Sequence, residues 1–266
     1  MGSYYDIRIC SLLLNKKEKV MTEKMNKVAK ITIYFWVLKI LATTLGETSG
    51  DLLSMTWGLG YLTSLMITTC FFVCVLLWQL RIPNFHSVLY WAVIVGTTSV
   101  GTEVSDLMDR TLGLGYMKGA FILASFLFIT LAVWYYREKN LEVYPIYERT
   151  KEIFYWIAVL FSNSLGTAFG DFLSDNMHLS YIGGALVCAG VIVVVVLLHY
   201  FSRINQIVLF WIAFVFTRPF GATFGDLLTK PIVKGGFNLG TLPASGVTLC
   251  FLAIVLFFAH RNKCND

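Results

Sequence analysis

Long apolar runs alternate with short polar segments along most of the chain. Each run has about 20 residues, the length that an α-helix needs to cross the hydrocarbon core of a bilayer. None of the runs alternates apolar and polar residues as a transmembrane β-strand does. We therefore expect eight transmembrane helices, over residues 31–51, 58–80, 88–107, 114–136, 153–172, 179–201, 205–228 and 239–260.

Four segments of the chain carry one motif and align without gaps. In each segment a Gly follows the first Trp by ten residues and an Asp follows it by fifteen. Repetition at fixed spacing is a property of the whole fold, because each copy is one structural unit. The aligned segments are Trp36–Asp51, Trp91–Asp106, Trp156–Asp171 and Trp211–Asp226.

Each copy of the motif lies in the first helix of a two-helix unit. An even number of helices gives every copy the same orientation, so the repeats are parallel and related by an axis along the membrane normal. The sequence thus predicts an all-α polytopic membrane protein of four two-helix repeats around a pseudo-symmetry axis. The odd-numbered helices, which carry the motif, are expected at the centre, and the even-numbered helices at the periphery.

The repeats divide the chain into two halves joined by a polar linker. Because repeats 2 and 3 are further apart than the other neighbours, we place the linker between them. The expected organisation is a basic N-terminal segment (1–30), repeats 1 and 2 (31–136), the linker (137–152), repeats 3 and 4 (153–260) and a tail (261–266).

Composition and charge agree with a membrane protein. Charged residues make up 14% of the chain and hydrophobic residues 57%, whereas a soluble domain has roughly 25% charged residues. The net charge of +5 is concentrated in the N-terminal segment and in alternate loops. Lys and Arg accumulate on cytoplasmic loops. We expect a protein of the bacterial inner membrane with both termini in the cytoplasm, whose partner is the lipid bilayer rather than nucleic acid.

Motifs that would indicate catalysis were not found. The chain has no Ser/His/Asp pattern, no HExxH sequence and no Gly-rich phosphate loop. Its six cysteines include no pair at metal-ligand spacing. We therefore expect neither an enzyme nor a resident cofactor.

Small residues recur four positions apart near the end of each motif-bearing helix. A small-xxx-small face lets a second helix backbone approach closely. These residues are therefore predicted to pack the central helices together. They are Gly46 and Gly50, Gly101 and Ser105, Gly166 and Gly170, and Gly221 and Gly225.

Acidic residues close each motif and are the main candidates for function. A charged side chain costs at least about 2.5–3.5 kcal/mol at the centre of a bilayer, so four repeated charges need a compensating partner. Glu47 and Glu103 add carboxylates to the same helix faces in repeats 1 and 2. The candidate cation-binding residues are Glu47, Asp51, Glu103, Asp106, Asp171 and Asp226.

Two interpretations of the four Asp residues remain open at this point. Each could cap the following helix by accepting backbone N–H groups. Alternatively, they converge with nearby hydroxyls as oxygen ligands of a small cation, because hard divalent ions prefer such ligands, or they carry protons. The first metal candidates are Glu47, Asp51, Glu103 and Asp106, since repeats 1 and 2 each have two carboxylates.

Two basic residues lie within the predicted helices. Arg218 precedes Asp226 by eight residues on roughly the same helix side. Because intramembrane charges usually pair, Arg218 is expected to be the counter-charge of Asp226, as a structural pair or as a movable one. Lys39 is expected to extend its ammonium to the inner membrane interface.

The repeated segments resemble a known family. TTLGETSGD, TTSVGTEVSD, NSLGTAFGD and RPFGATFGD are similar to the repeat of a family of uncharacterised bacterial membrane-anchored proteins, in which a repeat of unknown function occurs in up to four copies. The resemblance covers Ile31 to His260. It implies the repeat architecture and carries no activity.

The residues themselves favour transport. We expect a transporter or exporter of a small cation, with a divalent metal such as manganese or magnesium as substrate. The alternative is a non-transporting structural or assembly protein of the membrane, whose motifs only pack and cap helices.

Overall fold

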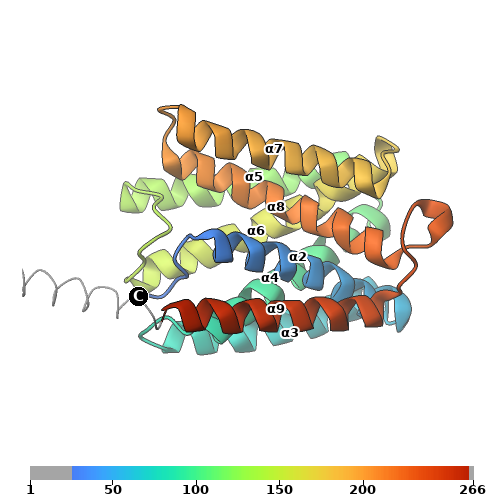
Figure 1. Ribbon diagram of the computed structural model, residues 1–266, viewed down its shortest axis with the longest axis horizontal. Coiled ribbons are helices and arrows are strands. Elements are labelled where there is room, and N and C mark those ends of the chain that lie inside the picture. The colour runs from blue at the N-terminus through green and yellow to red at the C-terminus, as the bar shows by residue number, and fades with distance from the viewer. Residues whose placement is uncertain (1–25, 264–266) are drawn as a thin grey trace, which may run out of the picture.

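The computed structural model describes residues 26–263, and its elements there are all helical. The basic N-terminal segment up to residue 25 and the end of the tail lie outside the described residues. Eight long helices lie side by side in one bundle (Figure 1), which confirms the predicted fold class. They are α2 (Ile33–Asp51), α3 (Gly60–Arg81), α4 (Ser87–Asp106), α5 (Tyr116–Glu138), α6 (Arg149–Asp171), α7 (Tyr181–Phe201), α8 (Gln206–Thr229) and α9 (Thr241–Lys263).

The four motif-bearing helices form a closed ring at the centre of the bundle. Helix α2 packs on α4, α4 on α6, α6 on α8, and α8 returns to α2. Each outer helix packs on the central helix of the following repeat: α3 on α4, α5 on α6, α7 on α8, and α9 on α2. The predicted division into central and peripheral helices is confirmed, and the outer helix of repeat 4, α9, packs on the central helix of repeat 1.

Six of the eight helices are long and apolar enough to span a bilayer by length and composition: α3, α5, α6, α7, α8 and α9. The polar residues of the motif make α2 and α4 less apolar. These residues lie inside the ring, where they do not meet lipid. The central helices α6 and α8 are 61% buried over their apolar windows, whereas the outer helices α3 and α9 are 17% buried. The chain is therefore a polytopic membrane protein.

Glycines set the close spacing of the ring. A Cβ on Gly46 would lie 2.0 Å from Thr98 Oγ1, and one on Gly221 would lie 2.1 Å from Thr43 Oγ1. A Cβ on Gly166 would lie 2.5 Å from Arg218 Cβ. These distances are far below van der Waals contact, so a larger side chain would separate the helices.

A short irregular helix follows three of the motifs. The π-helical turns η1 (Leu52–Thr56), η2 (Leu107–Thr111) and η3 (Phe172–Asn176) each begin directly after a motif Asp. Such turns interrupt the α-helical hydrogen-bond pattern and occur often at functional sites. Repeat 4 differs, because α8 continues to Thr229 and a 3₁₀ turn, η4 (Ile232–Lys234), follows it.

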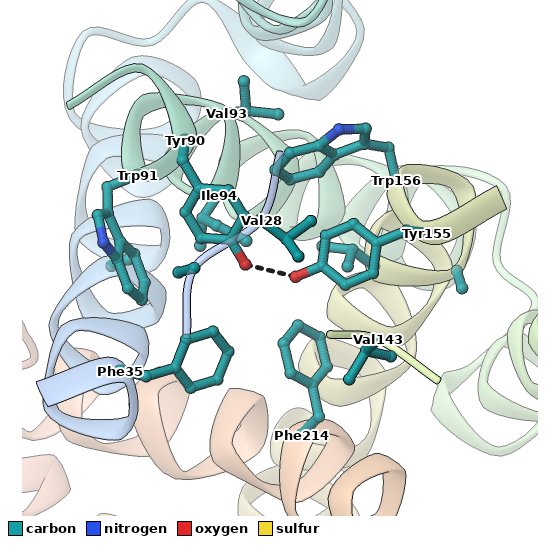
Figure 2. Packing of buried hydrophobic residues seen from close by; sticks show 14 of the residues in the cluster. Val28, Phe35, Tyr90, Trp91, Val93, Ile94, Val143, Tyr155, Trp156 and Phe214 are labelled. Carbon is teal, nitrogen blue, oxygen red and sulfur yellow. Dashed lines mark hydrogen bonds between the residues drawn. The ribbon is translucent and has the colours of Figure 1, made fainter. Parts of the chain in front are cut away.

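Aromatic side chains fill the end of the ring at which α2 begins, which we call the aromatic end. Tyr90 and Tyr155 point toward each other there and hydrogen-bond through their hydroxyls, and Val28 from the segment before α2 lies beside them (Figure 2). Trp91 and Trp156 are buried in the same cluster. Their burial packs the central helices together at this end. Helix α9 ends near this end of the bundle (Figure 1).

Candidate functional site

Three layers of side chains from the four central helices are buried within the ring. Residues four apart lie on one helix face, so the positions seven, eleven and fifteen residues after each first Trp form a continuous column. Every member is at most 6% exposed. The first layer is Thr43, Thr98, Asn163 and Arg218; the second is Glu47, Thr102, Thr167 and Ala222; the third is Asp51, Asp106, Asp171 and Asp226. We call the end with the third layer the acidic end.

Arg218 is the fully buried cation of this column. Its Nη2 lies 2.8 Å from Glu47 Oε2 and 2.6 Å from Thr102 Oγ1. The predicted pair with Asp226 is therefore wrong. Asp226 lies eight residues further along the same helix, about 12 Å at 1.5 Å per residue. Glu47 belongs to α2, which packs directly on α8 in the closed ring.

Lys230 neutralises the acidic end where repeat 4 meets repeat 1. Its Nζ lies 2.6 Å from Asp51 Oδ2 and 3.2 Å from Asp226 Oδ1. Burial alone would lower the pKa of Lys230, but the carboxylates of Asp226 and Asp51 raise it above its ordinary value. The ammonium therefore remains charged between the two carboxylates.

Arg110 has the equivalent place where repeat 2 meets repeat 3. Its Nε lies 3.0 Å from Asp106 Oδ1, and its Nη2 lies 3.4 Å from Asp171 Oδ2. Arg110 and Lys230 each follow their own motif Asp by four residues, whereas Met55 and Asp175 have this position in repeats 1 and 3. The basic residue therefore occurs in every second repeat, so the charge pattern of the four-repeat ring has two-fold symmetry.

This alternation was present in the sequence as a signal. Aligning the residue four positions after each Asp identifies Arg110 and Lys230 as candidate counter-charges of the motif. They are the main functional residues that the sequence reasoning missed.

The structure brings together three of the predicted carboxylates. Glu47, Asp51 and Asp226 each place one oxygen so that the three oxygens lie within 4.8 Å of one another, and all three residues are buried. We call this the carboxylate triad. The predicted metal set contained Glu103 and Asp106 in place of Asp226. Closure of the ring places α8 beside α2, which brings Asp226 to Glu47 and Asp51, whereas Asp106 pairs with Arg110.

Glu103 lies beside the triad and has no basic partner among the described residues. It is 0% exposed, and neither carboxylate oxygen makes a hydrogen bond of good geometry within residues 26–263. Its Oε1 lies 3.4 Å from the position of a Cβ on Gly50, and Asp51 and Ser54 are its polar neighbours. Burial of such a group without a partner is costly, so Glu103 can supply a ligand to a cation or hold a proton.

The acidic end contains more carboxylates than counter-charges. Three basic side chains make ion pairs with five of the carboxylates among the described residues. Glu103 is the sixth. The residual charge is therefore negative when all six are ionised, and the site favours an additional cation. The six are Glu47, Asp51, Glu103, Asp106, Asp171 and Asp226.

The motif Asp residues do not cap the following helices. Asp51, Asp106 and Asp171 make no side-chain capping hydrogen bond at the start of the π-helical turns. The N-caps of α3, α5 and α7 are Leu59, Gly115 and Ser180. The capping interpretation is wrong for these three residues, because their side chains point into the ring and pair with cations.

Lys39 lies one layer deeper and does not reach an interface. Its side chain is 0% exposed, and its Nζ donates to Asn163 Oδ1 at 2.7 Å. It also lies 3.9 Å from the centre of the Phe214 ring. The prediction that the Lys39 ammonium reaches the inner interface is wrong. Lys39 precedes Thr43 of the first layer by four residues, so it lies on the helix face that points into the ring.

Comparison with known protein families shows to which family the chain belongs. The model of a Repeat of Unknown Function (DUF347) matches four times, at residues 34–83, 89–140, 154–205 and 209–264. The chain belongs to this family, and the four matches coincide with the four repeats of the ring. Searches of curated proteins and of solved structures found no match.

Proposed function

We propose that this protein transports a small cation across the membrane, with a divalent metal ion as the first substrate class. The observation that supports the proposal is the carboxylate triad of Glu47, Asp51 and Asp226, buried where α2 packs on α8. Carboxylate and hydroxyl oxygens are the ligands that hard divalent cations prefer. A proton bound to the same carboxylates is the other candidate cargo.

The position of the triad within the bundle supports transport rather than a purely structural role. Ionisable residues inside a membrane bundle mark ion pathways when they face its interior. The triad lies close to one end of the ring, whereas aromatic side chains fill the other end. In this proposal the structure represents a state closed at the aromatic end, and transport requires those side chains to separate.

The proposed location is the bacterial inner membrane with both termini in the cytoplasm. The aromatic end would then face inward and the acidic end outward. The concentration of Lys and Arg before α2 supports this orientation. No catalytic step is part of the proposal.

A non-transporting structural protein is the alternative. The two bridges made by Lys230 and Arg110 favour it, because each joins the motif Asp residues of adjacent repeats. In this alternative the charges only hold the ring together, and no cation exchanges with them.

A flux assay distinguishes the two functions. The purified protein is reconstituted in liposomes that contain a metal-sensitive dye, and Mn²⁺, Mg²⁺ and Ca²⁺ are added outside with and without a pH gradient. We expect entry of at least one cation with the wild type and loss of entry with Asp51→Asn. The matched control, Lys118→Gln, changes an exposed charge on α5 and should keep the flux. Wild-type flux equal to that of empty liposomes for every cation would refute transport.

A further inference from the structure

We propose that Lys230 is a tethered cation that occupies the place of the transported ion and has to leave before the ion binds. This inference rests on the proposed function and states what the ion displaces. Its ammonium contacts Asp51 at 2.6 Å and Asp226 at 3.2 Å, two of the three residues of the carboxylate triad. An ion held by the same oxygens would take the position of Lys230 Nζ.

Lys230 is placed where its side chain is able to move away. Its side chain is 22% exposed, whereas that of Arg218 is 0% exposed. Lys230 is the first residue after α8, with an extended backbone, and Pro231 follows it. Lysine also carries a compact, strongly hydrated charge on a flexible stem. Arg218 thus remains as the fixed counter-charge of the triad, and Lys230 is the exchangeable one.

The position of Glu103 supports a second positive charge at the carboxylate triad, beyond the single charge of the Lys230 ammonium. Among the described residues this fully buried carboxylate has no ion pair, and it lies beside Asp51. The Lys230 ammonium pairs with Asp51 and Asp226 and not with Glu103, whereas a divalent cation next to Asp51 would give Glu103 a cationic partner. A second positive charge at this place is therefore favourable for the surrounding carboxylates.

The equivalent bridge in the other half lacks these features. Arg110 spans Asp106 and Asp171, but within residues 26–263 a cluster of three convergent ligand residues occurs only at the junction of repeats 4 and 1. We therefore place the exchange at Lys230 and assign Arg110 to holding the second junction.

The exchange explains how the ring remains stable without substrate. When the ion leaves, the ammonium returns to Asp51 and Asp226, so the two carboxylates are never buried without a positive charge. The same competition lowers the apparent affinity for the ion, which favours its release.

An affinity measurement tests the competition directly. Full-length wild type, Lys230→Gln and the control Lys118→Gln are titrated with MnCl₂ in detergent, and binding is followed by thermal stabilisation. We expect Lys230→Gln to bind Mn²⁺ roughly tenfold more tightly or better, because a competitor has been removed from its oxygens. The control should match the wild type.

Chemical labelling of the wild type gives a second readout that does not depend on a variant. Lysine acetylation by an N-hydroxysuccinimide ester is measured by peptide mass spectrometry with and without MnCl₂. We expect Mn²⁺ to raise the labelling of Lys230 and to leave that of Lys118 unchanged. A purely structural lysine would not respond in this way.

The outcomes separate this inference from the proposed function. Equal Mn²⁺ affinity in wild type and Lys230→Gln, with unchanged labelling, would overturn the exchange role and leave cation transport standing. If no protein binds Mn²⁺ and labelling is constant, the divalent site and the exchange both fail. If Lys230→Gln does not fold, the labelling experiment decides.

Discussion

The buried pair of Arg218 and Glu47 allows a sharp test of the ring. We consider the substitution Arg218→Met, which keeps an unbranched side chain and removes the charge. It leaves Glu47, which is 4% exposed, without its ion-pair partner, and it removes a donor from Thr102. The perturbation is therefore confined to the second and first layers of the column.

The expected loss of stability is large. At the separation of 2.8 Å, Coulomb's law with an effective dielectric constant of about 20 gives an attraction of roughly 6 kcal/mol. Part of this attraction offsets the cost of dehydrating both groups, and removing one member of a buried pair costs about 3–5 kcal/mol. Total stabilities are about 5–15 kcal/mol, so Arg218→Met should destabilise the protein severely.

A double-mutant cycle measures the pair itself. The free energy of unfolding is determined in detergent for wild type, Arg218→Met, Glu47→Gln and the double variant. We expect the double variant to be more stable than Arg218→Met, because Glu47 is then no longer a buried charge without a partner. Asp226→Asn is the comparison, and it should cost less than Arg218→Met because Lys230 still pairs with Asp51.

Two results would refute this reasoning. Additive losses in the double variant would mean that Arg218 and Glu47 do not interact. A larger loss with Asp226→Asn than with Arg218→Met would instead support the pair that the sequence predicted, in which Arg218 depends on Asp226.

Two further predictions concern Glu103 and the ring contacts. Glu103→Gln should weaken Mn²⁺ binding while the melting temperature of the ion-free protein stays equal or rises, because an unpartnered buried carboxylate is removed; unchanged binding in the same titration would exclude Glu103 as a ligand. Gly46→Val should prevent assembly of the ring, since even a Cβ there would lie 2.0 Å from Thr98 Oγ1, whereas Gly190→Ala faces open space. Size-exclusion chromatography of both variants in detergent checks this, and a wild-type profile for Gly46→Val would contradict the packing.

Local patterns were sufficient to predict the helices and their arrangement into centre and periphery. The length of an apolar run and its spacing to the next run are properties of neighbouring residues, so eight helices and four parallel repeats followed directly. The sorting of Gly and Asp onto alternate helices likewise identified the ring, because charged groups are unfavourable at the lipid face and small residues let helix backbones approach closely.

Only the tertiary structure decided which charges meet. The partner of Arg218 lies on another helix. Which residue becomes the partner depends on which helices are adjacent and on the position of each layer of side chains along the ring axis. Residue spacing along a helix gives information about one helix at a time. It therefore predicted a pair between Arg218 and Asp226 and an interfacial position for the Lys39 ammonium. The ring closes α8 against α2, and this contact between repeats 4 and 1 creates the carboxylate triad and places Lys230 on it.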